Sequence, residues 1–181
     1  MTLEQLNALD AATAARELRR CCGSNAWTAR MVAARPFASA AAMQSAADRI
    51  WSALDESDWR EAFAAHPAIG SSGSGRSGGS GLSRRSREAA KADWSAQEQS
   101  GVATATTGVI DRLAAKNREY EARFGYIFIV CATGKSADEM LTLLEDRLPH
   151  DPAAEIRIAA DEQRKITRLR LQKLLAGDEG R

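Results

Sequence analysis

The sequence predicts an all-α fold, namely a single-domain multi-helix bundle with one buried extended connector. Apolar residues recur at helical spacing along most of the chain, alanine is abundant, and aromatic residues make up only 6% of the 181 residues. Only residues 126–131 form the apolar run expected of a strand, and one strand cannot build a sheet alone. Because 44% of the chain is apolar, it can bury a substantial core, and we expect one domain over residues 1–181.

Capping and stop residues divide the first part of the chain into five predicted helices. Ser, Thr and Asp side chains cap first turns, glycine ends helices, and a residue that precedes proline disfavours the helical conformation. On these signals, Thr2 with Gln5 begins the first helix, and the second covers residues 11–22 up to Gly23. Ser24 or Asn25 caps a third helix that ends near Arg35, Ser39 begins the fourth, and the fifth covers residues 58–65. The fourth is expected to place on one face Met43, Ala46, Ala47, Ile50 and Leu54.

A Gly/Ser-rich segment follows the fifth predicted helix. Residues 70–81 contain only glycine, serine and Arg76. This composition cannot bury apolar area, so we expect a flexible loop at 70–82 within the domain. The segment lacks the Gly-Lys-Ser/Thr ending and the preceding strand of a phosphate-binding loop. The nearby arginines could bind an anion, although solvated surface side chains are the simpler explanation.

Helical patterning resumes after this loop. The connector, residues 126–131, is expected to be extended or tightly buried backbone between two of the later helices. The first of those helices starts near Ser83, the next runs from Ser95 toward Thr107, and a third covers residues 109–123 and is stopped by Gly125. The fourth runs from Ser136, which forms a capping box with Glu139, to Leu148, and the last runs from Asp151 and Pro152 to near Gly177.

Charge and cysteine usage limit the classes of function. The 25 basic and 24 acidic residues nearly cancel, which argues against nucleic acid or an anionic membrane as partner and favours a small-molecule substrate. No apolar run reaches membrane-spanning length, and the first residues do not read as a signal peptide. The odd number of cysteines, three, argues against a disulfide framework and for a cytoplasmic location. Two histidines about eighty residues apart give no metal-ligand cluster, so we expect no metal site.

His66 is the first candidate for chemistry. It precedes Pro67 where the fifth predicted helix gives way to the Gly/Ser-rich loop. An imidazole exchanges protons near neutral pH, and histidine is the commonest general acid or base. The alternative is an imidazole that only closes the helix. The second histidine, His150, is expected in a surface turn.

Two further segments carry polar groups that a ligand could use. Ser95 and Glu98 have capping-box spacing and could simply begin a helix, or Glu98 and Gln99 could present a carboxylate and an amide to a polar ligand. Both interpretations can hold together. In the connector, buried N–H and C=O groups outside a helix need partners, and a planar ligand with ureido edges could supply them. Packing alone explains most of that segment.

Six short motifs occur in order along nearly the whole chain. They are His66-Pro67-x-Ile69-Gly70, Trp94-Ser95-x-x-Glu98-Gln99-x-Gly101, Asn117-x-x-Tyr120-x-x-Arg123-Phe124-Gly125, Phe128-Ile129-Val130-Cys131-Ala132, Arg147-Leu148 and Glu162-x-x-Lys165-Ile166-x-x-Leu169-Arg170-Leu171. Each motif is weak alone, but six in order are highly specific. Together they resemble the 2-oxo-4-hydroxy-4-carboxy-5-ureidoimidazoline (OHCU) decarboxylases of the ureide pathway.

This resemblance implies an all-helical fold, usually a homodimer, and cofactor-independent loss of CO2 that gives (S)-allantoin in urate catabolism. It implies that His66 and Glu98 are catalytic. The implied substrate-binding groups are Pro67, Ser95, Gln99, the backbone of Phe128, Ile129, Val130, Cys131 and Ala132, and a late arginine, which we place at Arg170.

Several points stay open at the level of sequence. Arg168 competes with Arg170 as the late arginine, because two residues separate directions by about 200° at 3.6 residues per turn. Ala68 and Ser71 depart from the basic and acidic residues common in the family. The rival hypothesis from another class is a non-enzymatic helical module that binds a partner through its apolar faces and an anion through its arginine-bearing loop.

Overall fold

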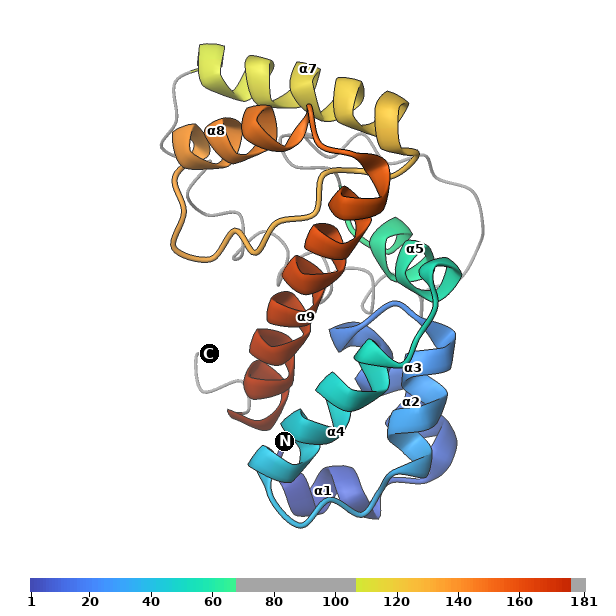
Figure 1. The fold of residues 1–181 in the computed structure, drawn as a ribbon. Helices are drawn as coiled ribbons and strands as arrows, with labels where there is room; N and C mark the ends of the chain where they lie inside the picture. The colour runs from blue at the N-terminus through green and yellow to red at the C-terminus, as the bar shows by residue number, and fades with distance from the viewer. Residues whose placement is uncertain (68–106, 177–181) are drawn as a thin grey trace, which may run out of the picture. The chain divides into compact units, whose positions relative to one another are not determined.

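The computed structural model describes residues 1–67 and 107–176, and all regular secondary structure in these ranges is helical (Figure 1). The predicted all-α class is confirmed. The predicted helices near Ser83 and Ser95 and the loop at 70–82 lie outside the described residues. The helices are α1 (Leu3–Ala8), α2 (Ala11–Cys21), α3 (Asn25–Ala33), α4 (Ala40–Ser52), α5 (Glu56–Ala64), α7 (Thr107–Phe124), α8 (Ala137–Arg147) and α9 (Pro152–Ala176).

The described chain forms two compact units, of which the first comprises residues 1–65 and 160–176 and the second comprises residues 66–67 and 107–159. Helix α9 begins in the second unit and continues into the first. The expectation of a single domain stays a prediction. None of the helices in the described ranges has the length and apolar character needed to cross a membrane.

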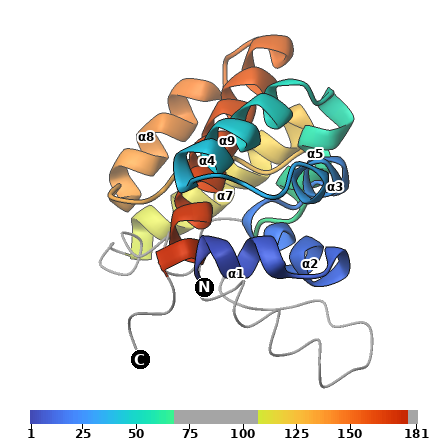
Figure 2. The same ribbon diagram turned by 90° about the horizontal axis from the view of Figure 1, so that it is seen from below.

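The first unit contains α1 to α5 and most of α9. Helix α3 lies against α2, α4 and α5, and its place beside α2 can be followed in Figure 2. Two indole N–H groups tie the elements together, since Trp27 donates to Ala47 O at 3.2 Å and Trp51 donates to Ala160 O at 2.9 Å. The largest buried side chains of this unit include Leu6, Leu18, Trp27, Met31, Met43 and Phe63.

Local capping explains where these helices begin. The predicted capping box of Thr2 and Gln5 is present at α1, and Ser24 and Ser39 cap α3 and α4. Helix α5 begins at Glu56, two residues earlier than predicted, because the Asp55 side chain accepts the N–H of Asp58.

The predicted core face of α4 is partly wrong. Helix α4 ends at Ser52, so Leu54 lies beyond it, although Leu54 is buried. Ile50 is only half-buried, and Trp51 takes the core position that the prediction gave to Ile50. The indole N–H of Trp51 reaches a backbone carbonyl of α9, and this fixes the ring in the core.

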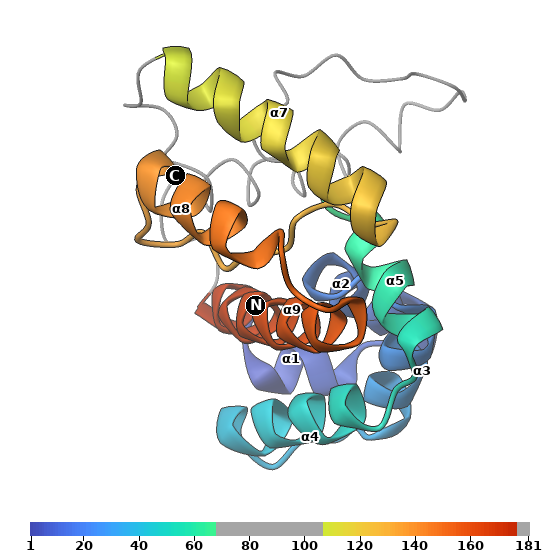
Figure 3. The ribbon, with the colours of Figure 1, turned by 45° about the horizontal axis from the view of Figure 1, so that its top comes forward.

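The second unit is built from α7, α8, the connector and the first turns of α9. Helices α7 and α8 pack side by side, as Figures 1 and 3 both show. Between them the chain turns at Gly125, whose φ is 78°, and then runs without regular structure through residues 127–132. Phe128, Ile129, Val130, Cys131 and Ala132 are all buried. The prediction of one buried connector in a helical protein is therefore confirmed.

Candidate active site

His66 directly follows α5 and its C-cap residue, Ala65. The predicted position of His66 at a helix end is therefore confirmed. Its side chain is half-buried, and Pro67 is exposed. Helix α5 packs into the core through two of its own residues, Ala62 and Phe63, which are fully buried. The packing of α5 therefore fixes the backbone from which His66 projects. Glu98, Ser95 and Gln99 lie outside the described residues.

The connector is held by side chains from the helices on either side of it. Asn117 of α7 accepts the N–H of Phe128 through Oδ1 at 3.1 Å, and Arg147 of α8 donates from Nη1 to Ile129 O at 2.9 Å. Farther along, Lys135 donates from Nζ to Cys131 O at 2.9 Å. The buried backbone polar groups expected to need partners thus receive several of them from side chains.

Asn117 is buried, with 4% of its surface exposed. Its Oδ1 is used by Phe128, and its Nδ2 atom has no hydrogen-bond partner within the described part of the chain. A buried donor without a partner costs about 1–3 kcal/mol. This amide therefore leaves a hydrogen-bond donor available next to the connector.

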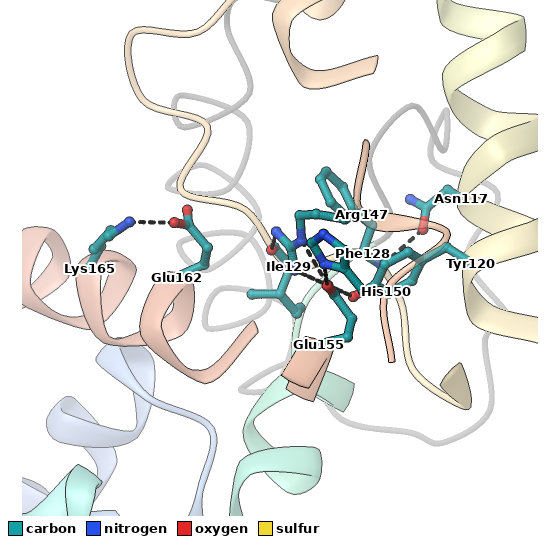
Figure 4. Close-up of polar contacts among 9 residues, drawn as sticks. All are labelled: Asn117, Tyr120, Phe128, Ile129, Arg147, His150, Glu155, Glu162 and Lys165. Atoms are coloured by element: carbon teal, nitrogen blue, oxygen red, sulfur yellow. Dashed lines mark hydrogen bonds and ion pairs between the residues drawn. The ribbon is translucent and has the colours of Figure 1, made fainter. Parts of the chain in front are cut away.

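A carboxylate with no exposed surface, Glu155, organises the polar groups behind the connector (Figure 4). Its Oε1 accepts Arg147 Nε at 2.7 Å and lies 2.5 Å from Arg147 Nη2, and it also accepts the hydroxyl of Tyr120. Its other oxygen, Oε2, lies 2.7 Å from His150 Nδ1. Four side chains from α7, α8, the turn before α9 and α9 itself thus meet at one buried point.

Tyr120 acts as a donor in this network. Burial, more than any other cause, raises the pKa of its hydroxyl above the usual value, with Arg147 opposing and the Glu155 carboxylate adding to the rise. A phenol whose pKa is raised keeps its proton at neutral pH, so it can donate to Glu155. The guanidinium of Arg147 also lies over the Phe128 ring, 4.6 Å from its centroid.

Sequence reasoning missed most of this network. His150 was expected in a surface turn, but it is half-buried and contacts a fully buried carboxylate. Asn117, Tyr120 and Arg147 belong to the six motifs, but the sequence predicts no role for them. Glu155 gave no signal at all, because a glutamate in the first turn of a helix usually complements the helix dipole at the surface.

The two late arginines have opposite environments. Arg168 is exposed, and its guanidinium forms an ion pair with Asp48, with Nε 3.0 and 3.1 Å from the two carboxylate oxygens. The hydrogen bond that Arg168 donates to Asp48 is the largest cause of a rise in the pKa of Arg168. Arg170 has 2% of its surface exposed. As the expected rotation between positions 168 and 170 requires, the two side chains point in different directions. Arg168 lies at the surface and Arg170 is buried.

The vicinal thiols Cys21 and Cys22 are buried in the first unit. Burial, the largest cause in both cases, raises the pKa of Cys21 to about 12 and that of Cys22 to about 11. Thiols with such pKa values hold almost no thiolate at neutral pH and are not nucleophiles. Among the described residues, neither a disulfide nor a group of three metal-ligating side chains occurs.

Comparisons with known proteins agree with the motifs. A family model described as OHCU decarboxylase matches residues 7–172. The chain is 38% identical over 161 residues to the uric acid degradation bifunctional protein TTL of Arabidopsis thaliana, which covers 88% of this chain and 47% of that protein. It is 37% identical over 79 residues to the OHCU decarboxylase of Amia calva, covering 44% of this chain and 45% of that one. The matches therefore span about half the length of these two relatives.

One solved structure is similar over nearly its whole length. A crystal structure of OHCU decarboxylase in the presence of (S)-allantoin is 35% identical to this chain, with a TM-score of 0.73. The similarity covers 90% of this chain and 99% of that one.

Proposed function

The chain belongs to the OHCU decarboxylase family, and on this premise we propose that it catalyses cofactor-independent decarboxylation of OHCU to (S)-allantoin and CO2 in urate catabolism. The observation that carries the proposal is the similarity to the OHCU decarboxylase crystal structure, which extends over 99% of that chain. The family model, which spans residues 7–172, supports it.

The substrate itself can accept the electron pair that decarboxylation releases. Its carboxylate is attached to a carbon next to a ring carbonyl and an imine-like nitrogen, so the pair can delocalise into an enolate-like system. The protein then has to orient the carboxylate, stabilise the developing charge and deliver one proton to one face. These three tasks need hydrogen-bond donors and a proton-transfer group in fixed positions.

We assign the proton transfer to His66 with Glu98. A half-buried imidazole at the end of a well-packed helix supports this role, because its backbone is fixed while its ring can still reach a ligand. Glu98 would orient the imidazole or hold the substrate hydroxyl. Pro67, Ser95 and Gln99 are proposed to contact the substrate.

The connector and Arg170 are proposed to hold the ring and its substituents. In support, the backbone from Phe128 to Ala132 is buried outside any helix, where its peptide groups can pair with ureido and carbonyl edges. Arg170 suits a carboxylate or carbonyl through its planar fork. Arg168 is the weaker candidate, since its side chain is exposed at the surface, whereas that of Arg170 is buried.

Two further expectations complete the proposal. We propose a homodimer, as expected for the family. We also propose a cytoplasmic location, as expected for a chain with an odd number of cysteines. Sedimentation equilibrium at micromolar concentration tests the dimer, and a mass equal to one chain would refute it.

The first experiment follows the decay of freshly generated OHCU in the ultraviolet, with chiral detection of allantoin. Wild type should accelerate decay to the S enantiomer. His66→Ala and Glu98→Ala should each lose at least the roughly hundredfold acceleration expected of a general acid or base. Wild-type decay that matches the spontaneous, racemic background would refute the proposal and favour the helical module instead.

A further inference from the structure

Two buried side chains from different helices hold consecutive residues of the connector. Asn117 of α7 accepts the N–H of Phe128 at 3.1 Å, and Arg147 of α8 donates to the carbonyl of Ile129 at 2.9 Å (Figure 4). The first bond lies before the peptide group that joins the two residues, and the second lies after it. Together they fix the chain on both sides of that peptide group.

Arg147 is itself held by a rigid partner. Its Nε and Nη2 atoms lie 2.7 and 2.5 Å from one oxygen of Glu155, which leaves Nη1 for Ile129. Because a guanidinium is planar, a fixed Nε edge sets the direction of Nη1. The position of Glu155 therefore determines where the Ile129 carbonyl is held.

Glu155 cannot easily shift. It has no exposed surface, and in addition to Arg147 it contacts the hydroxyl of Tyr120 and the imidazole of His150. A buried ion pair contributes little net stability compared with apolar residues of the same volume. Stability alone is thus a poor explanation for this network, whereas a requirement for fixed geometry accounts for it.

We propose that Arg147 and Asn117 are positioning residues for the decarboxylation. They set the orientation of the connector peptide groups that hold the substrate, and neither needs to touch the substrate itself. The inference rests on the proposed function, because it takes the backbone of Phe128 to Ala132 as a substrate-binding element.

Arg147→Lys tests the first of the two residues. Lysine keeps the charge that Glu155 needs, but a single ammonium cannot reproduce the planar fork that serves both Glu155 and Ile129. Rates are measured per folded molecule, below the melting temperature determined by circular dichroism. We expect KM for OHCU to rise roughly tenfold or more, whereas a purely structural role would lower only the folded fraction. Arg112→Lys, at the exposed ion pair with Glu145, is the matched control and should leave KM and kcat unchanged.

Asn117 provides a second, independent variant pair in case Arg147→Lys fails to fold. Asn117→Ala removes the acceptor for the Phe128 N–H and should raise KM for OHCU. Asn117→Asp keeps an oxygen at the same place and should recover part of that loss. In hydrogen exchange of the ligand-free protein, the Phe128 amide should exchange faster in Asn117→Ala than in wild type or Arg112→Lys.

The outcomes separate the two proposals. If wild type does not accelerate OHCU decay, the proposed function fails, and the positioning role fails with it. If wild type is active while the folded variants keep wild-type KM and kcat, only the positioning role is overturned. Unchanged exchange at Phe128 in Asn117→Ala would also overturn it, since the connector would then not depend on that bond.

Discussion

Gly23 lies so close to Ala65 that a Cβ on Gly23 would sit 2.3 Å from the Ala65 Cβ. The same Cβ would be 3.4 Å from the carbonyl oxygen of Ala62, in the last turn of α5. Gly23, which follows α2 and its C-cap residue Cys22, therefore also permits α5 to pack closely against the junction between α2 and α3. Ala65 is the residue before His66, so this contact sets the backbone of the proposed catalytic histidine.

Gly23→Ala should lower both stability and activity. The clash is with the short, rigid side chain of Ala65, so the backbone must shift, and such overpacking costs about 1–3 kcal/mol. We expect a lower urea midpoint, and a lower kcat per folded molecule because the shift reaches His66. Gly108→Ala is the control, since no atom of the described residues lies within 4 Å of a Cβ there and alanine is the better helix residue. Equal midpoints for the two variants would contradict the close contact.

Glu155→Ala should be among the most destabilising single substitutions in the second unit. It leaves the buried guanidinium of Arg147 without its carboxylate, and breaking a buried pair in this way costs about 3–5 kcal/mol. Glu145→Ala also removes a carboxylate from an arginine, but Arg112 has 66% of its side chain exposed, so the loss should stay below about 1 kcal/mol. Urea denaturation compares the two, and similar losses would show that Glu155 is not the centre of the network.

Local signals explain why much of the fold could be predicted. Thr2 with Gln5 and Ser136 with Glu139 both form the capping boxes that their spacing indicates, because a cap depends on four consecutive residues. The buried connector was predictable for a similar reason, as its apolar run has no second strand to pair with. Asp55 was overlooked as a cap, which moved the expected start of α5 by two residues.

The polar network behind the connector could not be predicted, because its partners meet only through tertiary packing. Tyr120 and Glu155 are 35 residues apart, and Arg147 and Ile129 are 18 apart. The ion pair that distinguishes Arg168 from Arg170 joins residues separated by 120 positions. Helical rotation indicated that only one of the two arginines would face inward, but not which one.

Because of the adjacent thiols of Cys21 and Cys22, the free energy of unfolding should fall as pH rises into the alkaline range. Both thiols have a folded-state pKa above the ordinary 9.0, near 12 for Cys21 and near 11 for Cys22, with burial as the main cause. Their stabilising contribution is complete below pH 9, because both states are then protonated. As pH rises beyond 9, the unfolded state releases protons that the folded state retains, so the free energy of unfolding falls until the folded thiols also ionise.

Urea unfolding at pH 8 and pH 10 measures this effect. Wild type should lose roughly 1 kcal/mol per thiol more than a Cys21→Ala/Cys22→Ala variant across this interval. The double variant will be less stable at both pH values because of the cavities, so the difference between the two pH values is the relevant quantity. Equal losses in both proteins would mean that the thiols ionise normally in the folded state.

The paired substitutions Arg170→Lys and Arg168→Lys should separate the two candidates for the substrate anchor. Lysine keeps the charge at each position but loses the planar fork that suits a carboxylate or carbonyl. At Arg170, which is buried, we expect KM for OHCU to rise roughly tenfold or more, equivalent to about 1.4 kcal/mol of lost binding. At Arg168, whose guanidinium faces Asp48 at the surface, KM should stay within about twofold of wild type.

The same pair can be examined without turnover. (S)-Allantoin should raise the melting temperature of wild type and Arg168→Lys by mass action, and should raise that of folded Arg170→Lys much less. A larger loss of stabilisation at position 168 than at 170 would transfer the anchor to Arg168. In that case Asp48 would have to release the guanidinium when ligand binds, and Asp48→Asn should then tighten (S)-allantoin binding, because the competing carboxylate charge is gone.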